Sequence, residues 1–176
     1  MTSEDKCQND SLTPNESAAD VRLRTIEAAD LPVLYEFQLD TEANRLAATH
    51  PRNVDQFNDH WETILNDPSV TVRAIQFGDE LAGCISCFKS DEHDSIGYWI
   101  GKDFWGKGVA TQALRLLLGE VSARPLHARV AVSNVGSLRV LQKCGFGIID
   151  HRHSPADERY LECEEAILEL AKATHQ

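Results

Sequence analysis

Residues 98–111 read Tyr98-Trp99-Ile100-Gly101-Lys102-Asp103-Phe104-Trp105-Gly106-Lys107-Gly108-Val109-Ala110-Thr111, and the fold expected for this chain is built outward from them. The aromatic and β-branched residues at positions 98–100 favour a strand. A turn with two glycines follows, and from Ala110 to Val121 apolar side chains recur at helical spacing. The pattern predicts a strand, a glycine-rich turn and a helix in direct succession.

This turn has the features of an anion-binding site. The first N–H groups of a helix have no intrahelical partner, and the helix dipole adds partial positive charge there. Gly106 and Gly108 have no Cβ, so a ligand can approach the main chain closely. A phosphate group is therefore the expected ligand of the turn.

Three kinds of phosphate loop compete for this stretch. Gly101 to Lys107 matches a nucleoside triphosphate loop, but Gly108 stands where that loop has the Ser or Thr that holds Mg²⁺. A dinucleotide fold would have a third glycine at Thr111 and an early parallel βαβ unit, and neither is present. The third interpretation is a loop that binds the pyrophosphate of an acyl-CoA.

Composition narrows the class of protein. The 176 residues are 42% hydrophobic and 26% charged, as in a one-domain globular protein. The net charge of −11 argues against nucleic acid as a partner and is compatible with a cationic acceptor. Five irregularly spaced cysteines, no membrane-spanning apolar run and a polar N-terminus predict a cytoplasmic protein without a membrane partner.

The chain is expected to hold a disordered tail at residues 1–19 and one domain at residues 20–173. Residues 40–51 are polar and are predicted to be irregular, with at most one helical turn. Helices are predicted at 31–39, 54–65, 109–121 and 134–144, and strands at 21–26, 70–77, 81–88, 95–100, 125–132, 146–151 and 165–170. This order is that of a mixed α/β or α+β domain.

Two motifs together resemble the GNAT superfamily of acyl-CoA N-acetyltransferases. Trp105-Gly106-Lys107-Gly108-Val109-Ala110 is similar to the superfamily loop Gln/Arg-x-x-Gly-x-Gly/Ala, with the aromatic first residue of the RimJ/RimL-like branch. Asn134 to Phe146 resembles the same branch's Asn-x-x-Ser segment, which is followed by Lys-x-Gly-Phe. The resemblance covers roughly residues 21–171.

The resemblance implies a GNAT fold and acetyl-CoA as cosubstrate, without a metal. Its sheet is mostly antiparallel and splays between the fourth and fifth strands, at 95–100 and 126–132, and the acetyl thioester lies in that gap. Asn134 would contact the pantetheine or order the splay. The N–H groups of the turn would bind the pyrophosphate, with Lys107 adding charge, through Gly106, Lys107, Gly108, Val109, Ala110 and Thr111. The pantetheine arm would pair with the main chain of Tyr98, Trp99 and Ile100, where an N–H near Ile100 would stabilise the oxyanion.

The catalytic groups are less well defined. Many superfamily members protonate the departing CoA thiolate with a tyrosine seven residues past the Asn, and here that position is Leu141. Ser137 is the substitute that the branch implies, although a hydroxyl at this position can instead cap the helix. Glu42, Asp157 and Glu158 are candidates for the general base, against the alternatives of solvated surface charges or a water chain.

The expected activity is acetyl transfer to a primary amine, a protein N-terminus or a small amine, by direct attack in a ternary complex. A non-catalytic acyl-CoA-binding module is the alternative from another class, and a homodimer is compatible with the fold. Cys84 and Cys87 have metal-like spacing but lie in a predicted strand, where they favour core packing over zinc. His151-Arg152-His153 is interpreted as an exposed strand edge.

Overall fold

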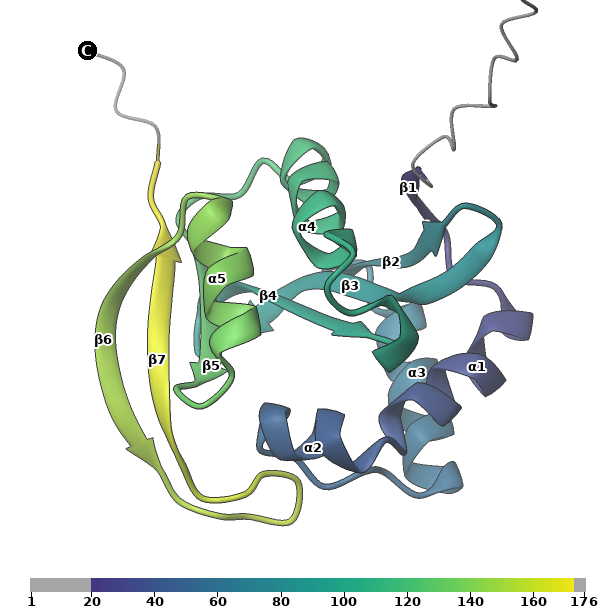
Figure 1. The fold of residues 1–176 in the computed structure, drawn as a ribbon, viewed down its shortest axis with the longest axis horizontal. Helices are drawn as coiled ribbons and strands as arrows, with labels where there is room; N and C mark the ends of the chain where they lie inside the picture. Colours follow the sequence, from purple (N-terminus) through teal and green to yellow (C-terminus); the bar gives the residue numbers. More distant parts are fainter. Residues whose placement is uncertain (1–19, 173–176) are drawn as a thin grey trace, which may run out of the picture.

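A computed structural model describes residues 20–172, so the tail expected at residues 1–19 lies outside the described residues. The described residues form one seven-stranded sheet with the spatial order β1-β2-β3-β4-β5-β7-β6 (Figure 1). All neighbouring strands are antiparallel except the parallel pair β4 and β5. The strands are β1 Val21–Arg24, β2 Thr71–Phe77, β3 Glu80–Ser90, β4 His93–Ile100, β5 Leu126–Ala131, β6 Gly147–Ser154 and β7 Cys163–Leu170.

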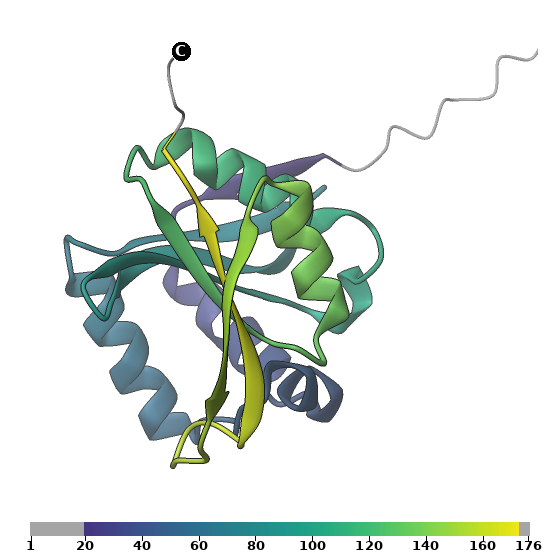
Figure 2. The same cartoon turned by 90° about the vertical axis from the view of Figure 1, so that its left-hand side faces the viewer.

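Helices cover both faces of the sheet, with α4 and α5 on one face and α1 and α3 on the other (Figures 1 and 2). The helices are α1 Leu31–Gln38, α2 Thr41–Ala47, α3 Val54–Asn66, α4 Val109–Glu120 and α5 Val135–Lys143, with 3₁₀ turns at Ala28–Asp30 and Lys102–Phe104. Helices α4 and α5 bury Leu114, Leu117 and Leu141 in a core that also holds Leu126 and Leu168 of the C-terminal strands. On the opposite face, α1 and α3 form a smaller core with β2.

The sheet splays between β4 and β5. Only Asp94–Leu126 and Ser95–His127 are paired, after which β4 runs on to Ile100 without a partner on that side. Strand β5 keeps its other partner, β7, along its whole length. The splay predicted between the fourth and fifth strands is therefore confirmed, and it leaves one edge of β4 with unpaired backbone groups.

The prediction for residues 40–51 was wrong, because Thr41–Ala47 form the helix α2. Its first turn is capped by the Asp40 carboxylate, which accepts a hydrogen bond of 2.8 Å from the Ala43 N–H. Asn44 is buried and donates through Nδ2 to the Gln38 carbonyl at 2.6 Å. The helix escaped prediction because it buries only Ala43 and a polar Asn44, so its sequence lacks an apolar stripe.

Two hairpins are longer than predicted. The polar residues 89–93, expected as a loop, continue β3 and β4 around a turn at Asp91 and Glu92, whose φ values are 49° and 68°. Strand β6 extends to Ser154, and strand β7 already begins at Cys163. In both cases backbone pairing continues through polar residues, which period-two hydrophobicity does not detect.

The loop between β6 and β7 is joined to the segment that follows α2. The His50 N–H donates to the Arg159 carbonyl at 2.8 Å, and the Leu161 N–H donates to the Ala48 carbonyl at 2.8 Å. Thr49 and Tyr160 form an isolated antiparallel bridge between these hydrogen bonds. The two segments thus connect the N-terminal and C-terminal halves of the chain across the splayed side of the sheet.

Candidate active site

A cavity of about 530 Å³ lies along the splayed edge of β4. It runs from the N-terminus of α4 to the N-terminus of α5, and α2 forms part of its wall. The predicted cofactor-binding residues that line this first cavity are Tyr98, Trp99, Ile100, Gly106, Gly108, Val109, Ala110, Thr111, Asn134 and Ser137. Residues far apart in the chain are therefore brought to one continuous surface.

The glycine-rich turn opens directly onto this cavity. Gly106 and Gly108 adopt left-handed φ values of 74° and 77°, which L side chains rarely adopt. A Cβ at Gly106 would have nothing within 4 Å, and one at Gly108 would meet only the Gln112 side-chain amide at 3.6 Å. Gly108 is the N-cap of α4 and has no side chain to cover the helix end, so the N–H groups of Val109 to Thr111 lie at an open helix N-terminus.

Lys107 is the predicted cofactor residue that does not line the first cavity. Its ammonium nitrogen lies over two aromatic rings, 5.8 Å from the Phe77 centroid and 5.6 Å from the Phe104 centroid. A cation above an aromatic face is attracted by the ring quadrupole. The side chain thus packs under the turn in this structure, whereas its backbone belongs to the turn itself.

Backbone direction in β4 follows from its pairing with β3. The Gly101 N–H donates to the Ala82 carbonyl at 2.8 Å, toward β3. Backbone N–H and C=O groups alternate sides along an antiparallel strand. Those of Tyr98 and Ile100 therefore point away from β3, toward the gap between β4 and β5. The Ile100 carbonyl accepts a hydrogen bond of 2.9 Å from Trp105 Nε1, so its N–H is the group left to face a ligand.

Ser137 and Tyr98 form a hydroxyl pair within the cavity. The Tyr98 Oη and Ser137 Oγ atoms are 2.7 Å apart, and either can donate. Burial raises the pKa of the Tyr98 phenol to about 12, while the hydrogen bond to Ser137 opposes this shift. Tyr98 therefore stays a neutral hydrogen-bond donor at physiological pH. Sequence reasoning placed Tyr98 only by its main chain and missed this side-chain contact.

The helix-capping role at the start of α5 belongs to Asn134. Its side-chain oxygen Oδ1 accepts a hydrogen bond of 3.1 Å from the Ser137 N–H, which satisfies an otherwise unpaired helix donor. Ser137 is thus the capped residue, and its hydroxyl is directed to Tyr98 instead. Leu141, at the superfamily's tyrosine position, is 1% exposed and packs in the core.

The three carboxylates predicted as candidate bases come from two parts of the structure, Glu42 from α2 and Asp157 and Glu158 from the loop between β6 and β7. Glu42 lies at the start of α2 and forms an ion pair with Lys102, with 2.6 Å between Oε2 and Nζ. It lines neither the first cavity nor a second cavity that adjoins it. The hydrogen bond that Lys102 donates to Glu42 raises the pKa of Lys102. Glu158 is exposed and also lines neither cavity.

Asp157 lines a second cavity, but one of its oxygens is occupied. Oδ1 accepts hydrogen bonds from the backbone N–H groups of Tyr160 at 2.6 Å and Arg159 at 2.7 Å. These two bonds lower the pKa of the Asp157 carboxyl. The residue shapes the loop between β6 and β7 in addition to facing the cavity.

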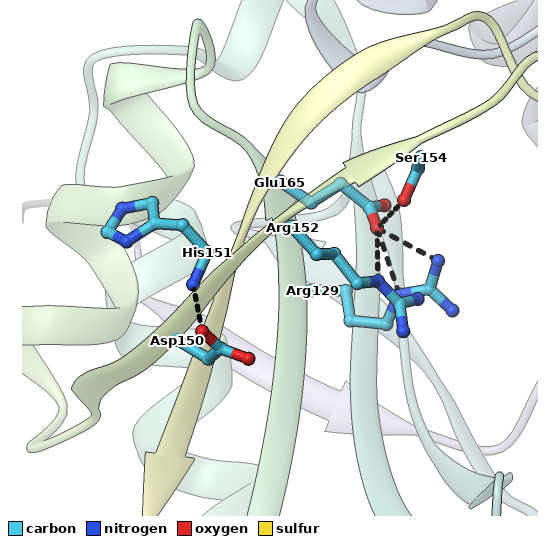
Figure 3. Close-up of polar contacts among 6 residues, drawn as sticks. All are labelled: Arg129, Asp150, His151, Arg152, Ser154 and Glu165. Carbon is cyan, nitrogen blue, oxygen red and sulfur yellow. Dashed lines mark hydrogen bonds and ion pairs between the residues drawn. The ribbon is translucent and has the colours of Figure 1, made fainter.

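The second cavity, of about 550 Å³, adjoins the first at Ala47 of α2, which lines both. Its walls come from β4, β5, β6, β7 and the loop that contains Asp157. Three polar side chains on the wall, those of Arg129, Arg152 and Ser154, contact a fourth, that of Glu165 (Figure 3). Sequence reasoning missed this cluster. Arg152 lies on the exposed edge strand β6, as expected, and the β6–β7 register places it directly opposite Glu165.

Other candidate features carry no ligand chemistry. Within residues 20–172 no group of three or more His, Cys, Asp or Glu side chains is arranged to hold a metal ion. Burial raises the pKa of the Cys84 thiol to about 12, so this cysteine is an inert core group. No helix in the described part of the chain is long and apolar enough to cross a membrane.

The chain belongs to the GNAT acetyltransferase family, whose domain matches residues 20–147. It is therefore an acetyltransferase, and the family resemblance predicted from the two motifs is confirmed. Among relatives, the uncharacterised N-acetyltransferase p20 of Bacillus licheniformis is 28% identical over 138 residues, which cover 70% of this chain and 77% of the relative.

Solved structures share the fold at lower identity. The spermidine N-acetyltransferase of Vibrio cholerae, in complex with CoA and spermine, has a TM-score of 0.71 at 16% identity and covers 85% of this chain and 95% of its own. The ribosomal L7/L12 α-N-protein acetyltransferase RimL, in its apo form, has a TM-score of 0.73 at 19% identity and covers 89% of this chain and 92% of its own. At these identities the likeness establishes the fold.

Proposed function

We propose that this acetyltransferase transfers the acetyl group of acetyl-CoA to a primary amine by direct attack in a ternary complex. The observation that carries the proposal is the first cavity, which joins the open N-terminus of α4 to the unpaired edge of β4. The second cavity adjoins it at Ala47 and supplies room for the amine. The reacting groups would meet at the splay between β4 and β5.

Acetyl-CoA binding uses main-chain groups. The N–H groups of the turn from Gly106 to Thr111, including that of Lys107, bind the pyrophosphate. The pantetheine arm lies along the unpaired edge of β4, as an added strand would, and pairs with backbone groups of Tyr98 and Ile100. Trp99 holds the strand in place, because its Nε1 donates to the Phe37 carbonyl at 3.1 Å.

The chemical step needs an oxyanion donor and a proton donor. The amine nitrogen attacks the thioester carbonyl carbon, and the Ile100 N–H stabilises the negative oxygen of the tetrahedral intermediate. When the carbon–sulfur bond breaks, the Ser137 hydroxyl gives its proton to the CoA thiolate. The nitrogen, which is positively charged after the attack, loses a second proton to water as the amide forms. The Tyr98 hydroxyl, 2.7 Å away, returns a proton to Ser137 and is itself reprotonated by solvent.

The amine must lose a proton before it attacks, because an alkylammonium has no lone pair. We propose that water in the second cavity accepts this proton, and that a nearby carboxylate can assist as a base. Asp157 is the best placed of the three candidate carboxylates, since it lines that cavity and its Oδ2 takes part in none of its backbone hydrogen bonds. Glu42 and Glu158 line neither cavity, so a role for either requires movement of its side chain.

The acceptor class proposed is a protein N-terminus or a small amine, which spans the substrates named for the RimL and spermidine acetyltransferase structures. A cytoplasmic location fits the four free cysteines among the described residues. A homodimer is also proposed, and sedimentation analysis would test it. None of these assignments changes the chemistry at the splay.

Two measurements test the proposed function. Release of free CoA thiol from acetyl-CoA, followed with a panel of amines and peptides, should show turnover with at least one acceptor. Calorimetry should show CoA binding without Mg²⁺ and no binding of ATP. Tight CoA binding without turnover on a broad panel would instead favour the non-catalytic acyl-CoA module.

A further inference from the structure

The wall of the second cavity carries a charge cluster that the acetyl-transfer chemistry does not use (Figure 3). Glu165 on β7 faces Arg152 directly across the β6–β7 ladder. Arg129 on β5 and Ser154 on β6 each pair with a residue two positions from Glu165 on β7, so they reach it diagonally. Cross-strand neighbours of opposite charge attract at this spacing.

The hydrogen bonds of this cluster converge on one oxygen, Oε2 of Glu165. Arg129 approaches it with Nη2 at 2.9 Å and Nε at 3.3 Å, and Arg152 with Nε at 3.2 Å. Ser154 donates to the same atom at 2.5 Å. Burial alone would raise the pKa of Glu165, but the hydrogen bonds from Ser154 and Arg129 outweigh it and leave the pKa low. Glu165 is therefore an ionised anchor for two arginines.

The two arginines keep most of their donor capacity. A guanidinium has five N–H groups. Within the described residues, Arg129 Nη1 and both terminal nitrogens of Arg152 make no hydrogen bond to protein. Each of the two side chains is 42% exposed, whereas Glu165 is 13% exposed. The Glu165 carboxylate thus fixes the two arginines, while their remaining guanidinium N–H groups stay accessible.

The cluster has an excess positive charge, because two arginines face one glutamate. The other charged side chains on the cavity wall, His153 and Asp157, make no hydrogen bond with this cluster. His153 contacts Glu162 and Glu164 at 3.0 and 2.9 Å, and Asp157 holds the backbone of its own loop. Held guanidinium pairs on the wall of a cavity are typical of sites for carboxylate or phosphate groups. This site stands out in a chain whose net charge is −11.

We propose that the preferred acceptor is a primary amine that also carries a carboxylate, which Arg129 and Arg152 bind in the second cavity. The proposal rests on the proposed acetyl transfer and names its substrate class. The carboxylate pairs with the free guanidinium N–H groups while the amine extends toward the splay. Such a group occurs in a peptide whose second or third residue is acidic and in a small amino carboxylate.

The experiment compares acceptors that differ only in the anionic group. Two peptides that begin Ser-Asp and Ser-Asn, and one amino carboxylate with its amide, are assayed by CoA thiol release. We expect kcat/KM to be about tenfold or more higher for the acidic member of a pair, as charge-assisted hydrogen bonds commonly provide. Whether the peptide pair or the small-molecule pair shows the larger ratio identifies the source of the carboxylate.

Three variants separate recognition from structure. Arg152→Gln should reduce the acid-to-amide ratio to near one. Glu165→Gln removes the negative charge that repels an acidic acceptor, but its side-chain oxygen still accepts hydrogen bonds from both arginines, so the ratio should be kept or increased. Arg73→Gln is the matched control, because Arg73 forms a comparable ion pair with Glu120 outside both cavities. Equal losses on acid and amide in Arg152→Gln would mean that the cluster only supports the sheet.

The outcomes also distinguish this proposal from the proposed function. Wild-type turnover with equal rates on acid and amide, or a preference for a polycation such as spermidine, would overturn the carboxylate site and leave acetyl transfer intact. Failure of the wild-type protein to release thiol with any acceptor would remove the proposed function itself.

Discussion

The Tyr98 hydroxyl lies 2.7 Å from the Ser137 hydroxyl, and this contact joins β4 to α5 across the first cavity. Tyr98 also makes a longer contact of 3.4 Å with the Ser137 carbonyl. In the proposed mechanism these two hydroxyls face the CoA sulfur. Their contact gives Ser137 a proton source that is independent of the helix cap, since Asn134 performs the capping.

Replacement of Ser137 should reduce turnover more than cofactor affinity. Ser137→Ala removes the group proposed to protonate the thiolate, and we expect kcat to fall by about 10²-fold, in the range of general-acid contributions. The dissociation constant for CoA, measured by calorimetry, should change by only a few-fold. Unchanged kcat would exclude the proton-donor role.

Replacement of Tyr98 should have a smaller effect. Tyr98→Phe keeps the ring and removes the hydroxyl that supports Ser137, so kcat is expected to fall roughly tenfold or less. Because the Tyr98 pKa is about 12, the rate of the wild-type enzyme should show no loss from Tyr98 ionisation below pH 10. A drop as large as that of Ser137→Ala would instead make Tyr98 the direct donor.

An anion placed in the glycine-rich turn should abolish CoA binding. Gly108→Asp puts a carboxylate beside the open N-terminus of α4, where it competes with the pyrophosphate and repels it. Gly108→Ala is the uncharged control, because its Cβ meets only the Gln112 amide at 3.6 Å. It bears the cost of the left-handed φ, about 1–2 kcal/mol of stability, but should still bind CoA. Equal loss of calorimetric CoA binding in both variants would point to strain rather than charge.

Removal of the α5 cap should destabilise the domain. Asn134→Ala leaves the Ser137 N–H without its side-chain acceptor, at a cost of about 1 kcal/mol in the free energy of unfolding. Asn134→Asp keeps an acceptor oxygen and should restore most of that stability. Urea denaturation measures both variants, and a wild-type midpoint for Asn134→Ala would show that the cap contributes nothing.

His60 should make stability depend on pH. Burial, and then the charges of Arg52 and Arg159, lower its pKa from 6.5 to about 4. The unfolded chain therefore binds the proton more readily than the folded chain. The free energy of unfolding is unaffected by this group above pH 6.5 and decreases as the pH falls from 6.5 toward 4. Between pH 7 and 4.5 the loss should be on the order of 1–2 kcal/mol, because solvent screens the charge of this partly exposed side chain.

Urea denaturation of His60→Gln, compared with wild type across this range, isolates the contribution of His60. The difference between the two free energies of unfolding should shrink as the pH falls. His151→Gln, at an exposed position in β6, is the control and should follow the wild-type curve. Parallel curves for wild type and His60→Gln would contradict the assignment.

Most of the fold was predictable because its signals are local. The glycine-rich turn at Gly106 and Gly108, the apolar face of α4 and the left-handed Gly145 after α5 depend on short-range backbone geometry. The short helix α2 was not predictable in this way. It forms on an Asp40 cap and buries the polar Asn44, so its stability depends on contacts with distant parts of the chain.

The residues of the candidate site also fall into two groups, those in continuous motifs and those that only the fold brings together. The proposed cofactor-binding residues were predicted from the glycine-rich turn and from the Asn134–Ser137 segment, since each is a continuous motif. The pairing of Tyr98 with Ser137 spans 39 positions and depends on how α5 packs over the sheet. Arg129, Arg152 and Glu165 come from three strands, and only the register of β5, β7 and β6 brings them to one cavity wall.

By itself the sequence determined the family, through its two motifs, and the order of the elements apart from α2, because most elements follow from the spacing of glycines and apolar residues. Only the tertiary structure decided which carboxylates line a cavity, which hydroxyl supports Ser137 and what chemistry the acceptor side offers. The physical reason is that charge pairs and proton donors act over a few ångströms. That proximity arises from strand register and helix packing, between residues whose separation along the chain carries no signal.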